Sequence, residues 1–206
     1  KGFEDTALYV YTRLASLNSV GGDPTRFGAP RNRFHDFIGN RARAWPHAMN
    51  SSSTHDGKRG EDVRARINVL SEIPDEWEQR LDAWHEINRG RKPRIGEGDA
   101  AREVPDKNEE YLLYQTLLGA WEAEDARPSP EFTDRMEEYA VKAAKEAKVN
   151  TAWLTPDDAY EAALGEFVGR ILDPSADNRF LESFHPFQQE IAHYGFFNTL
   201  SQTLIK

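Results

Sequence analysis

Residues 51–66 are Ser51-Ser52-Ser53-Thr54-His55-Asp56-Gly57-Lys58-Arg59-Gly60-Glu61-Asp62-Val63-Arg64-Ala65-Arg66, a polar stretch that runs into a predicted helix. The stretch combines one imidazole, three carboxylates and four basic side chains. No apolar periodicity makes His55 and Asp56 core residues, and glycines bracket the Lys58-Arg59 pair. Functional side chains concentrate on loops that a rigid scaffold holds in place. We therefore interpret residues 51–60 as a functional loop and the mostly helical remainder as its scaffold.

The composition is that of a globular protein. A length of 206 residues suits one large domain or two small ones. A hydrophobic fraction of 38% with 11% aromatic residues is sufficient for a sizeable core. The formal net charge is −9 and the pI about 5.2, whereas nucleic-acid-binding domains are usually basic. We therefore expect a folded protein that has no nucleic-acid partner.

The absence of cysteine and of long apolar runs limits the cellular context. Without cysteine there is no disulfide framework and no thiolate metal site, which fits a reducing cytoplasm. No apolar run approaches the roughly 20 residues that span a bilayer, so no membrane partner is expected. The sequence starts at Lys1 without a signal-peptide pattern, and it stops inside an apolar periodic run. We expect the chain to be excised from a larger protein.

Helical periodicity dominates the rest of the chain. The helix that starts at Glu61 has two acids in its first turn, which the helix dipole favours, and an apolar stripe of Val63, Ile67 and Leu70. Residues 47–54 are a candidate strand, and residues 89–107, rich in glycine, proline and charge, are expected to form a mobile loop. The pattern predicts a mainly α chain with at most one or two short strands. Further helices are expected over residues 5–17, 33–44, 74–88, 109–121, 131–149, 155–171, 178–184 and 187–205.

The pair His55-Asp56 and the nearby Lys58 are suited to sugar recognition. Cleavage of a glycosidic bond needs carboxylates that face an oxocarbenium-like centre, and groups that bind the neighbouring hydroxyls. Asp56 can accept hydrogen bonds from vicinal hydroxyls, His55 can donate one, and Lys58 can hold an anionic or polar group. The alternative is a loop at a helix entry whose charges pair with one another in solvent. Composition leaves both interpretations open.

Other candidate motifs are weaker. Lys1, Glu4 and Asp5 lie together near a helix start, where acids also serve as ordinary capping groups. The remaining histidines lack metal-ligand spacing, and Gly96-Glu97-Gly98 follows no predicted strand, as a phosphate loop would. No metal and no cofactor are therefore expected. No nucleophile and acid/base pair for glycosidic chemistry can be assigned within this chain.

Collinear blocks spread over the whole chain carry a family resemblance. They include Thr54-His55-Asp56 and the longer block Tyr111-Leu112-Leu113-Tyr114-Gln115-Thr116-Leu117-Leu118-Gly119-Ala120-Trp121. The other matching blocks are residues 1–9, 16–18, 20–24, 58–59, 61–66, 69–74 and 198–202. Together they resemble the maltooligosyltrehalose synthase family of the α-amylase superfamily, whose members are built on a (β/α)8 barrel with inserted helical subdomains.

The resemblance implies that this chain is a multi-helix piece of such an enzyme. A complete barrel takes about 250 residues, and this sequence has too few strands for one. The expected division is a barrel-derived part over residues 1–60, which includes the active-site loop, and a helical subdomain over residues 61–206.

The same resemblance implies an activity and its residues. Members convert the reducing-end α-1,4 bond of a maltooligosaccharide to an α,α-1,1 bond by intramolecular transglucosylation. This retaining chemistry uses an aspartate nucleophile, a glutamate acid/base and a third, stabilising carboxylate. Asp56 resembles the third carboxylate and His55 its hydroxyl-binding neighbour, while Lys58, Lys1 and Glu4 fall in blocks that contact the reducing-end glucose.

Some expectations limit that picture. The nucleophile and the acid/base of the family lie upstream of Lys1, so the isolated segment is expected to be inactive. Gly57 and Gly60 stand where the family tends to have threonine and serine, and Asn50-Ser51-Ser52 replaces a more apolar strand. The alternative function is a non-catalytic helical module for packing or protein interaction.

Overall fold

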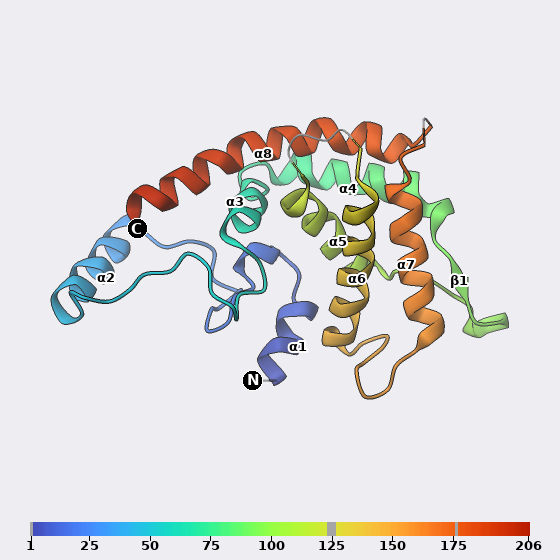
Figure 1. Cartoon of the computed structure of the whole chain (residues 1–206), viewed down its shortest axis with the longest axis horizontal. Helices are drawn as coiled ribbons and strands as arrows, with labels where there is room; N and C mark the ends of the chain where they lie inside the picture. Colours follow the sequence, from blue (N-terminus) through green and yellow to red (C-terminus); the bar gives the residue numbers. More distant parts are fainter. Residues whose placement is uncertain (1, 123–126, 176) are drawn as a thin grey trace.

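Helices make up most of the structure, a computed structural model that describes residues 2–122, 127–175 and 177–206 (Figure 1). The long helix α8 extends along one side of the molecule and packs against α3, α4, α5 and α7. Helix α6 packs on α7, and α1 packs on α6. The predicted mainly α fold is confirmed. The helices are α1 (Gly2–Val10), α2 (Arg31–Ala44), α3 (Glu61–Val69), α4 (Pro74–Asn88), α5 (Lys107–Ala120), α6 (Pro130–Ala147), α7 (Asp158–Leu172) and α8 (Arg179–Ile205).

The core is centred on the fully buried Trp84 of α4. Its ring lies against aromatic rings of α4, α5 and α8, at centroid distances between 5.3 and 5.9 Å. Tilted and edge-to-face pairs at this spacing are favourable beyond the area that they bury. The aromatic residues of three helices therefore meet in one cluster. Its members around Trp84 are Trp77, Tyr114, Phe180, Phe184 and Phe187.

Helix α3 is held closely between α5 and α8, because a glycine stands at each crossing. A Cβ atom on Gly119 of α5 would lie 2.6 Å from Val63 Cγ1. A Cβ atom on Gly195 of α8 would likewise lie 2.6 Å from Arg66 Cγ. Real Cβ contacts are longer than this, so the absence of a side chain permits both approaches. The start of α3, where the polar stretch ends, is thereby fixed to the helical core.

Helix α8 corrects the prediction of two helices over residues 178–184 and 187–205. It runs through Pro186 without a break. Proline inside a helix removes one hydrogen bond and costs about 3 kcal/mol. The side chains on both sides of it, Phe184, Phe187 and Ile191, are buried in the core. Burial of several large apolar side chains offsets that cost, so packing overrides the local helix-breaking signal.

The N-terminal helix is shorter than predicted. It ends at Val10, and of the expected continuation to residue 17 only a 3-10 turn at Ala15–Leu17 is present. Gln115 of α5 accepts a hydrogen bond from the Ala15 N–H at 2.8 Å and donates one to the Thr12 carbonyl at 2.8 Å. A distant side chain therefore satisfies backbone groups that a helix would have paired.

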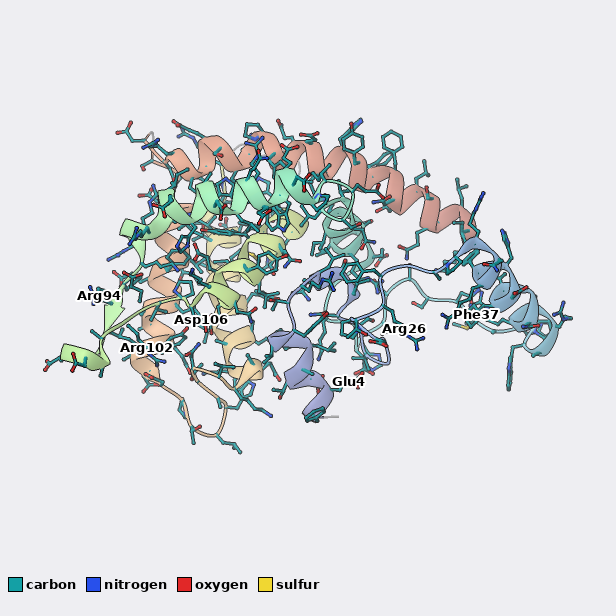
Figure 2. All side chains as sticks on the ribbon, turned by 180° about the vertical axis from the view of Figure 1, so that it is seen from behind. Glu4, Arg26, Phe37, Arg94, Arg102 and Asp106 are labelled. Atoms are coloured by element: carbon teal, nitrogen blue, oxygen red, sulfur yellow. The ribbon has the colours of Figure 1, made fainter. Side chains whose placement is uncertain are left out.

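The region between α1 and α3 contains no strand. Residues 47–54, the candidate strand, are irregular, so that prediction is wrong. A strand needs a neighbouring strand to pair its backbone groups, and among the described residues none pairs with this segment. Helix α2 has no buried residue, and the Phe37 side chain is 61% exposed (Figure 2). We call residues 19–50, which include α2, the arm.

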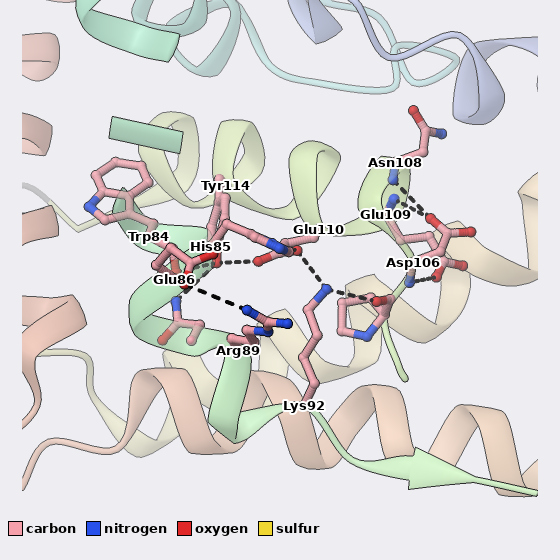
Figure 3. Close-up of polar contacts among 12 residues, drawn as sticks. Trp84, His85, Glu86, Arg89, Lys92, Asp106, Asn108, Glu109, Glu110 and Tyr114 are labelled. Carbon is pink, nitrogen blue, oxygen red and sulfur yellow. Dashed lines mark hydrogen bonds and ion pairs between the residues drawn. The ribbon is translucent and has the colours of Figure 1, made fainter. Parts of the chain in front are cut away.

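Residues 89–107 contain a small hairpin rather than an unstructured loop. Strands β1 (Arg94–Ile95) and β2 (Arg102–Glu103) pair antiparallel, with Arg94 opposite Glu103. The Lys92 ammonium anchors the hairpin base, 2.7 Å from Glu110 Oε2 on α5 (Figure 3). The mobility expected for this segment stays a prediction.

None of the helices in the described part of the chain is long and apolar enough to cross a membrane.

Candidate functional site

His55 and Asp56 occupy the two central positions of a tight turn. The Gly57 N–H donates to the Thr54 carbonyl at 3.0 Å and closes it. His55 Nε2 lies 3.5 Å from Asp56 Oδ2, with the two side chains 92% and 44% exposed. The structure therefore brings the predicted imidazole and carboxylate together at the surface, where a ligand hydroxyl can reach both.

The upstream side of this turn is attached to the first turn of α3. Ser53 Oγ accepts a hydrogen bond from the Glu61 N–H at 2.9 Å and donates one to the Glu61 carboxylate. The bond from Ser53 holds the pKa of the Glu61 carboxyl below its ordinary value. Arg64 donates to the Ser52 carbonyl. The turn is thus the tip of a loop whose two ends meet at one helix start.

The Lys58 side chain packs against helix α1. Its ammonium forms an ion pair with the Asp5 carboxylate, and both side chains are largely buried. Lys58 Nζ also lies 5.7 Å from the centroid of the Tyr9 ring, within the range of a cation–π contact. Burial raises the pKa of the Tyr9 phenol to about 12. The ammonium expected to bind a sugar is therefore engaged by a carboxylate of this chain.

The other two predicted site residues belong to the N-terminal end. Glu4 precedes Asp5 on α1 (Figure 2). Its Oε1 atom accepts a hydrogen bond from the Gly21 N–H at 2.6 Å. Gly21 has a φ of 75°, a conformation that glycine adopts without a steric penalty. Glu4 thereby holds the turn after residue 20. Lys1, the remaining predicted residue, lies outside the described residues.

The sequence did not indicate how Arg59 is used. Its side chain is buried, and it donates to the Tyr139 hydroxyl of α6 at 2.9 Å. Lys58 and Arg59 are adjacent basic residues, so the sequence did not indicate which of the two side chains would enter the core. The bracketing Gly57 and Gly60 were the one local signal that the backbone turns sharply here.

An open cavity of about 680 Å³ lies beside the upstream half of the loop. Ser51 and Ser52 line it together with residues of α2, α3 and the C-terminal part of α8. His55 and Asp56 do not belong to its walls. Concave sites with mixed walls are the usual places for ligands, but this one does not contain the candidate carboxylate.

The site chemistry is that of a carboxylate and an imidazole. Within the described ranges, no group of three or more histidine, cysteine, aspartate or glutamate side chains is placed to hold a metal ion. Asp56 can accept hydrogen bonds from a sugar hydroxyl, and His55 can donate one. Double displacement at a sugar needs two further carboxyl groups, a nucleophile and an acid/base.

Comparison with known proteins relates the chain to trehalose-forming enzymes. No family model matches it. It is 39% identical over 173 residues to a Mycobacterium tuberculosis protein assigned as a maltooligosyl trehalose synthase, covering 84% of this chain and 21% of that protein.

Solved structures agree with the sequence relative. The structure of DSM5389 glycosyltrehalose synthase superposes with a TM-score of 0.81 at 38% identity, covering 99% of this chain and 25% of that one. Maltooligosyltrehalose synthase from Arthrobacter ramosus gives a TM-score of 0.77 at 35% identity, over 96% and 23% of the two chains.

Fold and sequence together relate the chain to a helical part of the glycosyltrehalose synthases. The resemblance to the maltooligosyltrehalose synthase family is therefore confirmed. The chain spans between a fifth and a quarter of the length of the relatives that it matches.

Proposed function

We propose that this chain supplies the stabilising carboxylate, Asp56, of an enzyme that forms maltooligosyltrehalose. The observation that carries the proposal is the exposed Thr54–Gly57 turn, which presents Asp56 beside His55 on a loop attached at both ends. The names of the relatives support the same activity. A fixed carboxylate lowers the energy of a positively charged transition state because its negative charge is already in place and needs no reorganisation.

The proposed reaction is intramolecular. The bond between C1 of the penultimate glucosyl unit and O4 of the reducing-end glucose breaks, and O4 takes up a proton. C1, with the rest of the chain attached, then bonds to the anomeric oxygen O1 of the same glucose, which gives up its proton, to form an α,α-1,1 linkage. The substrate is a maltooligosaccharide. Residues 1–60 form the barrel-derived part of the site, and residues 61–206 form the helical subdomain that supports it. The nucleophile and the acid/base come from other parts of the whole protein.

The family resemblance implies roles for the neighbouring residues. His55 donates to a hydroxyl of the transferred glucosyl unit, and Lys58, Lys1 and Glu4 line the reducing-end subsite. The Lys58 ammonium already forms an ion pair with the Asp5 carboxylate. Lys58 therefore contributes to this subsite only if its ammonium binds the substrate and Asp5 at the same time. Asp5→Asn is therefore a variant in which Lys58 becomes more available.

The test uses the full-length protein. Asp56→Asn keeps the shape of the side chain and removes its charge, so turnover of maltopentaose should fall by at least roughly 100-fold. Asp99→Asn, an exposed residue of the hairpin segment, is the matched control and should leave turnover unchanged. Nearly normal turnover of Asp56→Asn would exclude the proposed role.

A non-catalytic helical module is the second candidate. It is favoured by the exposed aromatic and apolar side chains of the arm, among them Phe37, Trp45 and Met49. Such surfaces are common at sites of protein interaction. On this alternative, Asp56→Asn has no effect on turnover, whereas polar substitutions of the arm weaken association with its partner.

A further inference from the structure

Arg59 is a buried cation near the candidate carboxylate in the sequence. It stands three residues after Asp56, yet only 8% of it is exposed. Its guanidinium donates to the Ala15 carbonyl at 3.4 Å and to the Tyr139 hydroxyl at 2.9 Å. Among the described residues, none of the ion pairs includes Arg59. Burial of a charge without a counter-ion is costly, so an apolar residue would fill this space at a lower cost.

Both acceptors of Arg59 are held by consecutive residues of α5. Gln115 Oε1 accepts from the Ala15 N–H at 2.8 Å. Thr116 Oγ1 lies 3.5 Å from the Tyr139 hydroxyl. Gln115 and Thr116 are buried in the helical core. The two ends of the guanidinium fork therefore contact groups that one rigid helix fixes in position.

We propose that Arg59 is a positioning residue that sets the place of Asp56 for the reaction. The inference rests on the proposed function and extends it to the helical core. Ser53 and Arg64 hold the upstream side of the loop on α3. Arg59 holds the downstream side on the 3-10 turn at Ala15 and on α6, so the turn between them has little freedom to move. A displacement of about 1 Å in a reacting group costs on the order of 100-fold in rate.

The planar fork of arginine is essential to this role. It presents donors in a fixed geometry, whereas the lysine ammonium is a single point charge on a flexible stem. Lysine at this position keeps the charge but cannot reach the Ala15 carbonyl and the Tyr139 hydroxyl with the same geometry. Tyr139→Phe removes one acceptor and leaves Arg59 itself unchanged.

The experiment measures maltopentaose conversion by the full-length enzyme. For Arg59→Lys, kcat should fall roughly 10-fold or more while KM changes less than about 2-fold. The reason is that displacement of the Asp56 carboxylate weakens its interaction with the transition state more than with the bound substrate. Tyr139→Phe should lower kcat in the same direction by a smaller factor. Arg135→Lys is the matched control on α6, where the arginine pairs with Glu122 at the surface, and it should leave kcat unchanged.

The melting temperature of each variant separates positioning from simple support of the fold. A lower melting temperature with normal kcat per folded enzyme, in both Arg59→Lys and Tyr139→Phe, would overturn the inference. Active Asp56→Asn would instead contradict the proposed function itself. Inactive Asp56→Asn together with fully active Arg59→Lys and Tyr139→Phe would contradict the positioning role alone.

Discussion

The helical body of α3 to α8 and the arm use aromatic residues in opposite ways. In the body, the ring of Trp84 is fully buried among rings of three helices. In the arm, Trp45 is 72% exposed at the end of α2, and no residue of α2 is buried. The body therefore has a core of its own, whereas the described arm contributes little to it. The loop that presents His55 and Asp56 connects the two, and the body holds it.

The largest difference is expected between two tryptophan truncations. Trp84→Ala leaves a cavity in the aromatic cluster and also removes the hydrogen bond from its indole to Ser183 Oγ. It should lower the free energy of unfolding by about 3–5 kcal/mol, measured by urea denaturation. Trp45→Ala should change it by less than about 0.5 kcal/mol. Equal effects would show that the arm is part of the same packed unit.

The next effect concerns charge buried in the body. Glu110 and Lys92 are both about 4% exposed in their side chains, and Glu110 also contacts His85 Nδ1 at 3.0 Å and the Tyr114 hydroxyl at 2.8 Å (Figure 3). Glu110→Gln leaves the Lys92 ammonium buried without its carboxylate.

The cost of Glu110→Gln should be about 3 kcal/mol in denaturant unfolding. The matched control is Glu122→Gln, which breaks the exposed pair with Arg135 and should cost about 0.5 kcal/mol or less. If Glu110→Gln lowered the free energy of unfolding as little as Glu122→Gln does, water would have to reach Lys92 and the hairpin base would be open.

A smaller effect separates an aspartate that caps a helix from one that lies in an exposed turn. Asp106 accepts from the backbone N–H groups of Asn108 and Glu109, each at 2.9 Å, and so caps α5 in the body. Asp106→Ala should cost about 1 kcal/mol in thermal or urea unfolding. Asp23 accepts from the Thr25 N–H in the arm, and Asp23→Ala should cause no measurable change. A larger loss of stability for Asp23→Ala than for Asp106→Ala would mean that the arm contributes more to stability than the capped helix of the body.

The smallest effect is a pH dependence. Burial raises the pKa of the Glu109 carboxyl above its ordinary value of 4.5. The folded state therefore binds its proton more tightly, and stability falls as pH rises from 4.5 through the raised pKa.

Glu109→Gln should flatten that fall, because the amide does not titrate and its oxygen can still accept from Tyr160. Melting temperatures of the wild type and the variant, measured at a series of pH values from 4.5 upward, test this expectation. The exposed Glu103→Gln variant serves as control and should keep the original curve. An unchanged curve for Glu109→Gln would assign the fall to other groups.

Most of the helical body was predictable because its signals are local. Residues 74–88 match α4 from the proline at its first position to its last residue. The apolar stripe of residues 109–121 coincides with α5 to within two residues at its start. The segment after α2 was less predictable, since residues 47–54 carried a weak strand pattern that finds no partner strand among the described residues.

For the site, the sequence indicated which residues matter but not how they are arranged. His55 and Asp56 were adjacent in a polar loop, and the structure keeps them together at a turn. The ion pair of Lys58 with Asp5 joins residues 53 positions apart. The contact of Arg59 with Tyr139 spans 80 positions. A local pattern contains no information on either.

By itself the sequence determined the helical class, most helix positions, the polar loop and the family resemblance, because each depends on periodicity, capping or motifs within a few residues. The tertiary structure alone decided that α8 continues through Pro186, that Lys58 pairs with Asp5, and that Arg59 enters the core. The physical reason is the same in each case. Burial and pairing energies between distant segments exceed local preferences of one to three kcal/mol, and they exist only once the helices have packed.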